Sequence, residues 1–198
     1  MNRPTGQILD EYLVLACQSG SRVALDELAR RWTPRLLRFA TRRLQGHASA
    51  ASPAMLEAAR DVVQDTWLGA IRSLNKLNDP AVFPAWLYGI AHRKCIDWIR
   101  SNTRRRRLDG AVRSIEPEAP TAGREPDGEI DLARVIGRLP DEQRTVVLLY
   151  YGEDLGVNDI GRALDIPAGT VKSRLHHARE ALRKHLGEHH GRSGRGHS

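Results

Sequence analysis

Apolar residues recur at helical spacing over almost the whole chain, which leaves little room for any fold class other than all-α. Apolar positions three or four residues apart line one side of a helix, whereas strands alternate with a period of two. The first half of the chain predicts helices over residues 22–44, 53–74 and 84–105. Pro34 is expected to kink or divide the first of them. Ser52-Pro53 is a typical start for the second, a capping side chain followed by proline.

The last third predicts three or four shorter helices. Residues 146–151 are rich in β-branched and aromatic side chains, but the acidic start signal at residues 140–142 favours a buried helix there. A short helix over 158–164, a tight turn at Asp165-Ile166 and a longer helix opened by Pro167 follow. The longer helix has one apolar and one basic face. This order is typical of a helix-turn-helix unit.

An acidic segment separates two basic parts of the chain. The formal net charge is +7, yet residues 109–131 carry −5, with three prolines and no apolar periodicity. Residues 92–107 carry +6 and residues 167–186 carry +4. Such a segment is typical of a flexible linker. We therefore expect an N-terminal helical domain over 1–105, a linker over 106–128, a second helical domain over 129–187 and a disordered tail over 188–198.

Several classes of protein are disfavoured by what the sequence contains. The longest apolar runs are about six residues, too short for a membrane helix. Cys17 and Cys95 are far apart, which argues against a disulfide framework or a standard zinc site and fits a cytoplasmic location. Asp10 and Glu11 precede the short apolar run before Cys17, so an export signal is not expected.

The sequence also shows no pattern that is typical of an enzyme active site. No glycine-rich phosphate-binding loop occurs, and the carboxylates are concentrated in the linker segment, where nothing would hold a pair in fixed geometry. His185 and His189 have helical spacing, but neither cysteine nor carboxylate completes a metal site. We expect no catalytic residue, no cofactor and no metal.

Two separate sets of motifs resemble one family. Residues 139–144 (LPDEQR) and 169–175 (GTVKSRL) resemble region 4 of bacterial sigma-70 factors, most closely the extracytoplasmic function (ECF) group. Residues 61–67 (DVVQDTW) resemble region 2.2, and residues 83–91 (FPAWLYGIA) with 96–100 (IDWIR) resemble regions 2.3 and 2.4. The motifs occur in the family's order, with the linker between the two sets.

The resemblance implies a two-domain, all-α subunit of RNA polymerase that recognises promoters and has no catalytic residues of its own. Its expected partners are core RNA polymerase, through the clamp helices and the flap, and promoter DNA; a membrane partner is not expected. Members of the family are often held inactive by an anti-sigma factor, and this sequence does not identify one.

The resemblance also assigns three groups of residues. The group expected to dock on the clamp helices is Asp61, Gln64, Asp65 and Leu68. The group expected at the minus-10 element is Asn78, Asp79, Trp86, Tyr88, His92, Arg93, Lys94 and Arg100. The group expected at the minus-35 element is Thr170, Lys172, Ser173, Arg174, His176, His177 and Arg179.

Each group has an ordinary structural alternative. Lys and Arg attract phosphates in a salt-dependent way, but they also form any solvated helix face, as Asp and Gln do. Asn78 and Asp79 suit the reading of a base edge, yet turns commonly contain both residue types. Aromatic rings can stack on exposed bases, whereas the helical spacing of Trp86 and Trp98 favours the core.

The chain departs from the family pattern at four informative positions. Arg60 replaces the usual Glu beside the region 2.2 motif, and Arg93 replaces an Asn. Gly161 replaces the usual Ala in the first helix of the helix-turn-helix, at an expected cost of up to ~1 kcal/mol. Gly156 replaces a Ser or Thr cap. These differences concern specificity rather than the assignment.

Two other classes of function fit the sequence less well than a sigma factor does. A stand-alone regulator would bind duplex DNA as a dimer without polymerase, but it would not need a first domain that is itself basic and motif-bearing. A protein-interaction bundle such as an anti-sigma factor would have no use for two basic faces.

Overall fold

The computed structural model describes residues 5–46, 52–110 and 132–193, and over these residues the chain is helical, without a strand. The all-α prediction is thus confirmed. The helices are α1 (Thr5–Gln18), α2 (Arg22–Gln45), α3 (Pro53–Ser73), α4 (Phe83–Gly110), α5 (Leu132–Gly137), α6 (Asp141–Val147), α7 (Val157–Leu164) and α8 (Ala168–Ser193). Single turns occur at η1 (Leu74–Lys76), η2 (Pro80–Val82) and η3 (Leu148–Gly152).

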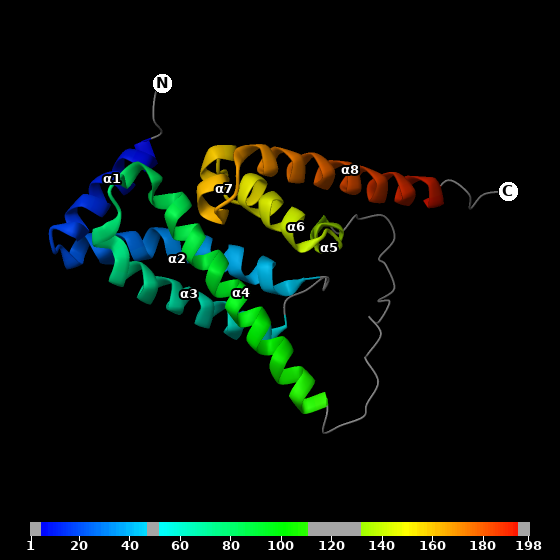
Figure 1. Ribbon diagram of the computed structural model, residues 1–198, viewed down its shortest axis with the longest axis horizontal. Helices are drawn as coiled ribbons and strands as arrows, with labels where there is room; N and C mark the ends of the chain where they lie inside the picture. Colours follow the sequence, from blue (N-terminus) through cyan, green and yellow to red (C-terminus); the bar gives the residue numbers. More distant parts are fainter. Residues whose placement is uncertain (1–4, 47–51, 111–131, 194–198) are drawn as a thin grey trace.

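Helices α1 to α4 form the N-terminal module, a bundle in which α2 packs against α1, α3 and α4 (Figure 1). Its core contains fully buried Leu28, Leu36 and Leu87 together with aromatic rings. Ser21 caps α2 and Ser52 caps α3 by accepting hydrogen bonds from the backbone nitrogens of Ala24 and Met55. The start predicted for α3 from Ser52-Pro53 is therefore confirmed.

Pro34 does not divide α2, contrary to one of the two expected outcomes. The helix runs without interruption from Arg22 to Gln45, and Pro34 lies on its exposed side. A proline in that position removes one intrahelical hydrogen bond, but water can reach the carbonyl it leaves free. The buried side chains Trp32 and Leu36 on either side of it continue the same packed face.

Helices α5 to α8 form the C-terminal module. Residues 146–151 are helical, as predicted, and continue from α6 into the π-helical turn η3. Ile160, Val171, Leu175 and Ala178 are buried where α7 and α8 meet. The module therefore contains the expected helix-turn-helix.

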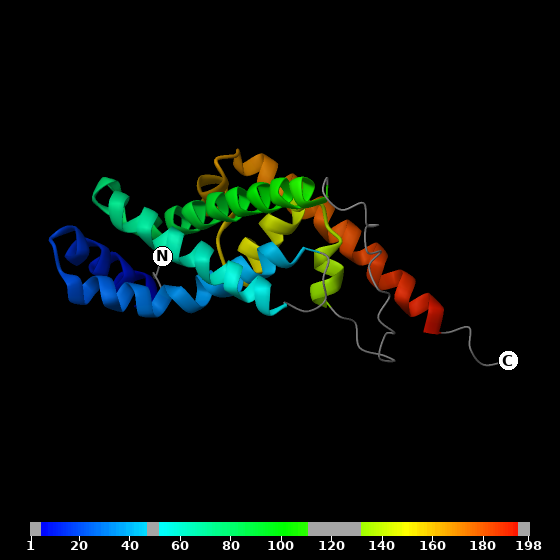
Figure 2. The same cartoon turned by 90° about the horizontal axis from the view of Figure 1, so that it is seen from below.

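The two modules pack directly against each other. Helix α7 lies along α4, and η3 lies against α2. Figures 1 and 2 show α5 to α7 beside the N-terminal bundle, while α8 extends past it.

Two of the expected boundaries are corrected by the helices. Helix α4 continues to Gly110, so residues 106–110 are helical rather than part of the linker. Helix α8 continues to Ser193, so residues 188–193 extend that helix instead of starting a tail. The central acidic segment 111–131 and residues 194–198 lie outside the described residues.

Candidate nucleic-acid and protein interfaces

Helix α3 carries all four side chains that were expected to dock on the polymerase. Its buried side packs Ala59, Val62 and Val63 into the bundle, so the opposite side faces solvent. The side chains exposed there are Asp61, Gln64, Asp65 and Leu68, the last with 46% of its surface accessible. An exposed leucine within an acidic and amide face is suited to a protein partner.

Two ion pairs set the charge of this face. Arg60, the departure from the family pattern, pairs with Glu57 one turn earlier, so its charge is balanced within α3. Lys94 of α4 lies with its Nζ 4.0 Å from Oδ2 of Asp65. Lys94 therefore lies at the border between the α3 face and the basic face of α4.

The loop between α3 and α4 presents Asn78 and Asp79 to solvent. Asp79 accepts a hydrogen bond from the backbone nitrogen of Ala81 at 3.0 Å, which starts the turn η2. Gln18 of α1 donates to the carbonyl oxygens of Leu74 and Leu77 at 2.9 and 2.8 Å, and so holds the base of this loop. The sequence analysis missed Gln18, because a single polar residue at a helix end carries no signal.

The remaining residues of the minus-10 group lie on α4 and differ in their exposure. Arg93 and Arg100 are exposed, and Lys94 is half-buried. Trp86 is half-buried against Phe83, with the ring centroids 6.0 Å apart. Trp86 packs against the core, as its helical spacing favoured.

Tyr88 is buried and His92 is half-buried, although both were expected at the minus-10 element. The Tyr88 ring is fully buried and meets Trp32 and Phe39 edge-on. Its hydroxyl donates a hydrogen bond to Glu153 of the C-terminal module, and burial together with that carboxylate raises the pKa of Tyr88. His92 is half-buried, and its Nδ1 is buried without a hydrogen-bond partner. Tyr88 therefore faces no surface that DNA could reach here, whereas His92 keeps part of its surface accessible.

The helix-turn-helix turn depends on two backbone features. Asp165 adopts a left-handed conformation with φ of 54° and ends α7. The carbonyl of Gly161 accepts from the backbone nitrogen of Ile166 at 3.0 Å. The turn thereby directs α8 across α7 with its apolar stripe inward.

The outer face of α8 holds the side chains expected at the minus-35 element. Those exposed are Lys172, Ser173, His176, His177 and Arg179, while Thr170 and Arg174 are half-buried. His176 and His177 lie 3.7 and 3.9 Å from Oε2 of Glu180. The structure therefore brings this group together on one helix.

Two arginines of the minus-35 group are positioned by neighbours within their own module. Arg174 pairs with Glu142 of α6 at 2.6 Å. Arg179 donates to the hydroxyl of Tyr151 at 2.8 Å and lies over that ring and the ring of Tyr150. Such contacts hold a guanidinium in place and reduce the entropy that it would lose on binding a ligand.

The geometry of α8 suits contact with a nucleic acid. A second helix of a helix-turn-helix with an exposed basic and polar face fits a major groove, where such groups meet phosphates and base edges.

Among the described residues, no group of three or more His, Cys, Asp or Glu side chains is placed to hold a metal ion. Across that same part of the chain, no helix combines the length and apolar character needed to cross a bilayer.

Comparison with known proteins gives a consistent result. The model of sigma-70 region 2 matches residues 28–105, and that of sigma-70 region 4 matches residues 129–182. The ECF RNA polymerase sigma factor SigW of Bacillus subtilis is 35% identical over 140 residues, covering 65% of this chain and 75% of SigW. SigM of Mycobacterium tuberculosis, another ECF sigma factor, is 33% identical over 180 residues, covering 90% and 85%.

A solved structure is similar over nearly the whole fold. CnrH, in complex with the cytosolic domain of CnrY, superimposes with a TM-score of 0.64 at 25% identity, covering 91% of this chain and 98% of CnrH.

Proposed function

The chain belongs to the ECF group of the sigma-70 family, and on this basis we propose which of its surfaces bind core RNA polymerase and which bind each promoter element. A sigma factor binds core RNA polymerase, recognises promoter DNA and directs transcription initiation. We assign polymerase docking to the exposed face of α3, minus-10 recognition to α4 and the loop before it, and minus-35 recognition to α8.

The observation that carries this assignment is the exposed basic and polar face of α8 in a helix-turn-helix. Lys172, Ser173 and His176 point outward from a helix whose opposite side is buried by Val171 and Leu175. Arg174 pairs with Glu142 of α6 and Arg179 donates to Tyr151 of η3, so both guanidinium groups are held beside that face.

The proposal includes no catalytic residue in this chain. The polymerase performs the chemistry, and the sigma factor contributes binding and orientation. It acts where core RNA polymerase acts, in the cytoplasm. Because CnrH was solved with part of a partner protein, we include a regulatory protein partner in the proposal as well.

Run-off transcription tests the function directly. The purified chain is mixed with bacterial core polymerase and a pool of promoter fragments from its host. Discrete start sites that require the chain are expected, and their upstream sequences would reveal both elements. If the chain gave no transcript but shifted duplex DNA alone, it would be a stand-alone regulator.

The division between the modules is tested with paired variants. Lys172→Ala with His176→Ala should abolish transcription from promoters that depend on a minus-35 element and leave the affinity for core polymerase unchanged. Asp61→Asn with Asp65→Asn is the complementary pair and should weaken core binding. An equal loss of core binding by both pairs would contradict the assignment. Fluorescence anisotropy with labelled chain measures that affinity.

A further inference from the structure

The guanidinium of Arg179 on α8 is held by uncharged groups. Its Nε donates to the hydroxyl of Tyr151 at 2.8 Å, and its central carbon lies 5.8 Å from the ring centroids of Tyr150 and Tyr151. The next residue in the chain, Glu180, lies toward two histidines of α8 instead. Over the residues that the structure describes, no carboxylate forms an ion pair with Arg179, so its charge is not offset by a neighbour.

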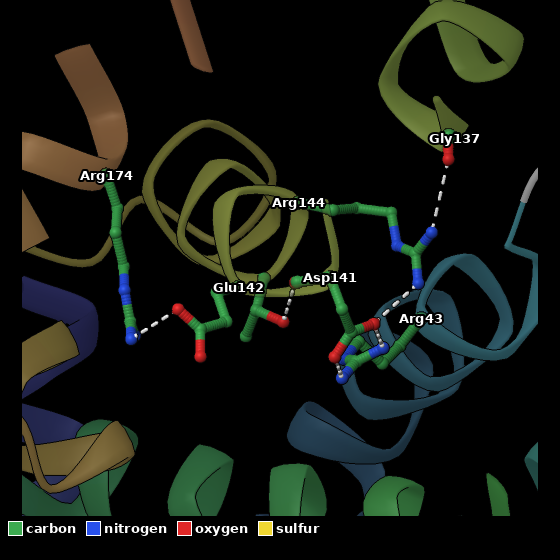
Figure 3. Close-up of polar contacts among 7 residues, drawn as sticks. Arg43, Gly137, Asp141, Glu142, Arg144 and Arg174 are labelled. Atoms are coloured by element: carbon green, nitrogen blue, oxygen red, sulfur yellow. Dashed lines mark hydrogen bonds and ion pairs between the residues drawn. The ribbon is translucent and has the colours of Figure 1, made fainter. Parts of the chain in front are cut away.

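Arg174, the other arginine of the minus-35 group, is held differently. It pairs with Glu142 of α6 at 2.6 Å, and only 24% of its side chain is exposed (Figure 3). A carboxylate beside a guanidinium offsets its charge and competes with an incoming anion. Because Arg179 has only neutral partners, it is the better anion site of the two.

Arg179 lies in line with the basic face of α8. An α-helix makes one turn in about 3.6 residues, so Lys172 and Arg179 are about two turns apart and project from nearly the same side. His176 lies between them, and all three side chains are exposed. The opposite side of the helix is buried at Val171. An anion bound to Arg179 would therefore lie along the surface that we assign to the minus-35 element.

Tyr151 comes from the turn η3, outside the second helix of the helix-turn-helix. Leu148 and Leu149 of that turn are buried, whereas Tyr151 is 58% exposed. Its ring meets the ring of Tyr150 edge-on, with the centroids 4.9 Å apart, and its hydroxyl lies beside the basic face of α8 through the hydrogen bond from Arg179. In helix-turn-helix proteins the second helix enters the groove, and the elements before it contact the DNA backbone. The position of Tyr151 therefore suits a backbone contact.

The Tyr151 hydroxyl can still donate its own proton. A phenolic oxygen can accept one hydrogen bond and donate another, and a guanidinium engaged through Nε keeps the N–H groups of its terminal nitrogens. Tyr151 has no acceptor for that proton within the described ranges of the chain. The free O–H and N–H groups lie next to each other and suit one anion with several oxygens. A phosphodiester of the DNA backbone is such an anion.

We propose that Tyr151 contacts promoter DNA directly and shares one backbone phosphate of the minus-35 element with Arg179. Tyr151 donates its hydroxyl proton to one phosphate oxygen, and Arg179 donates from a terminal nitrogen to the same phosphate. Such a contact fixes the position of the duplex without reading its sequence. The proposal rests on the proposed function, because it requires α8 to lie on DNA, and it adds a contact residue from outside α8.

Tyr151→Phe tests the contact, because it keeps the ring and removes only the hydroxyl. Core polymerase is assembled with the full chain, and its affinity for a labelled promoter fragment is measured by fluorescence anisotropy. Tyr151→Phe should weaken binding about tenfold, the effect of losing a hydrogen bond to a charged group. Tyr12→Phe makes the same change at another exposed tyrosine, on α1, and should leave the affinity unchanged. Equal affinity of the wild type and Tyr151→Phe would overturn the proposal.

Replacement of single phosphates distinguishes a direct contact from a structural role. Each phosphate flanking the minus-35 element is replaced in turn by an uncharged methylphosphonate. At one of them, the replacement should weaken binding by the wild type several-fold more than binding by Tyr151→Phe or Arg179→Ala. At the others, the loss should be the same for all three chains. If Tyr151→Phe binds more weakly but loses as much as the wild type at every phosphate, Tyr151 does not touch the backbone and the proposal is wrong.

Two further outcomes show which proposal has failed. If the wild-type chain with core polymerase bound no promoter, the proposed function would be contradicted, and the phosphate contact with it. If the wild type bound the promoter and Tyr151→Phe instead lost affinity for core polymerase in the absence of DNA, the hydroxyl would serve an acceptor on the polymerase. That result would overturn the phosphate contact and leave the proposed function standing.

Discussion

The protonation of His92 depends on its burial and on charged groups of both modules. Burial is the largest cause that lowers the pKa of His92, and with the charges of Arg43, Arg93 and Arg174 acting in the same direction and Asp141 against them, that pKa is about 4. These groups belong to α2, α4, α8 and α6, so His92 lies where both modules contribute charge. A protonated His92 would add a cation to this cluster.

Acidification should therefore destabilise the chain through His92. The unfolded chain takes up the proton near pH 6.5 and the folded chain near pH 4, so the contribution to stability is complete above pH 6.5 and is lost as the pH falls toward 4. Between about pH 7 and pH 5 the free energy of unfolding should fall by about 2 kcal/mol from this residue.

Urea titrations of the wild type and His92→Gln at both pH values measure the effect. The variant should lose less stability on acidification than the wild type. His176→Gln is the control, since that side chain is 68% exposed and should leave the pH dependence unchanged. A pH dependence identical in wild type and His92→Gln would show that His92 is not the responsible group.

At the scale of elements, Gly161 in α7 reverses an expectation drawn from helix propensity. Its position in a helix suggested a cost of up to ~1 kcal/mol relative to alanine. In the structure, a Cβ at Gly161 would lie 2.9 Å from the carbonyl oxygen of Ile166. The turn of the helix-turn-helix thus folds back too closely for any larger residue, and glycine is required there.

Gly161→Ala should consequently lower the stability of the C-terminal module instead of raising it. Gly169→Ala is the matched control near the start of α8, where open space surrounds the new methyl group and a gain of up to ~1 kcal/mol is expected. Thermal unfolding followed by circular dichroism distinguishes the two. A gain in stability from both variants would mean that the turn can move away from α7.

The sequence predicted elements well where local signals decide the structure. Ser52-Pro53 marked the start of α3, and the apolar stripe of α8 marked its buried side. The effect of Pro34 on α2 was harder to predict, because it depends on whether the proline faces solvent or the core. The sequence did not predict that α4 continues to Gly110, because the charged residues among 106–110 resemble the start of a linker.

At the scale of the whole molecule, the two modules could be predicted and their packing could not. In the sequence, Arg43 looks like one more exposed basic residue of an amphipathic helix, but in the structure its side chain is fully buried. Asp141 reads as a helix start signal, and Tyr88 was assigned to DNA. Each has an ordinary local explanation, and only the fold shows that Arg43 pairs with Asp141 and Tyr88 with Glu153, from one module to the other.

Packing between the modules should make them unfold together, and the tryptophans offer a selective probe. All four, Trp32, Trp67, Trp86 and Trp98, belong to the N-terminal module. In the wild-type chain, Gly161→Ala in the C-terminal module should lower the denaturation midpoint seen by tryptophan fluorescence, because one cooperative transition reports the stability of both parts. A Cβ at Gly89 of α4 would lie 2.9 Å from the backbone oxygen of Ala163 in α7, so Gly89→Ala should uncouple the modules. With Gly89→Ala also present, Gly161→Ala should leave that midpoint in place. A shift of equal size in both backgrounds would mean that the coupling does not pass through the contact between α4 and α7.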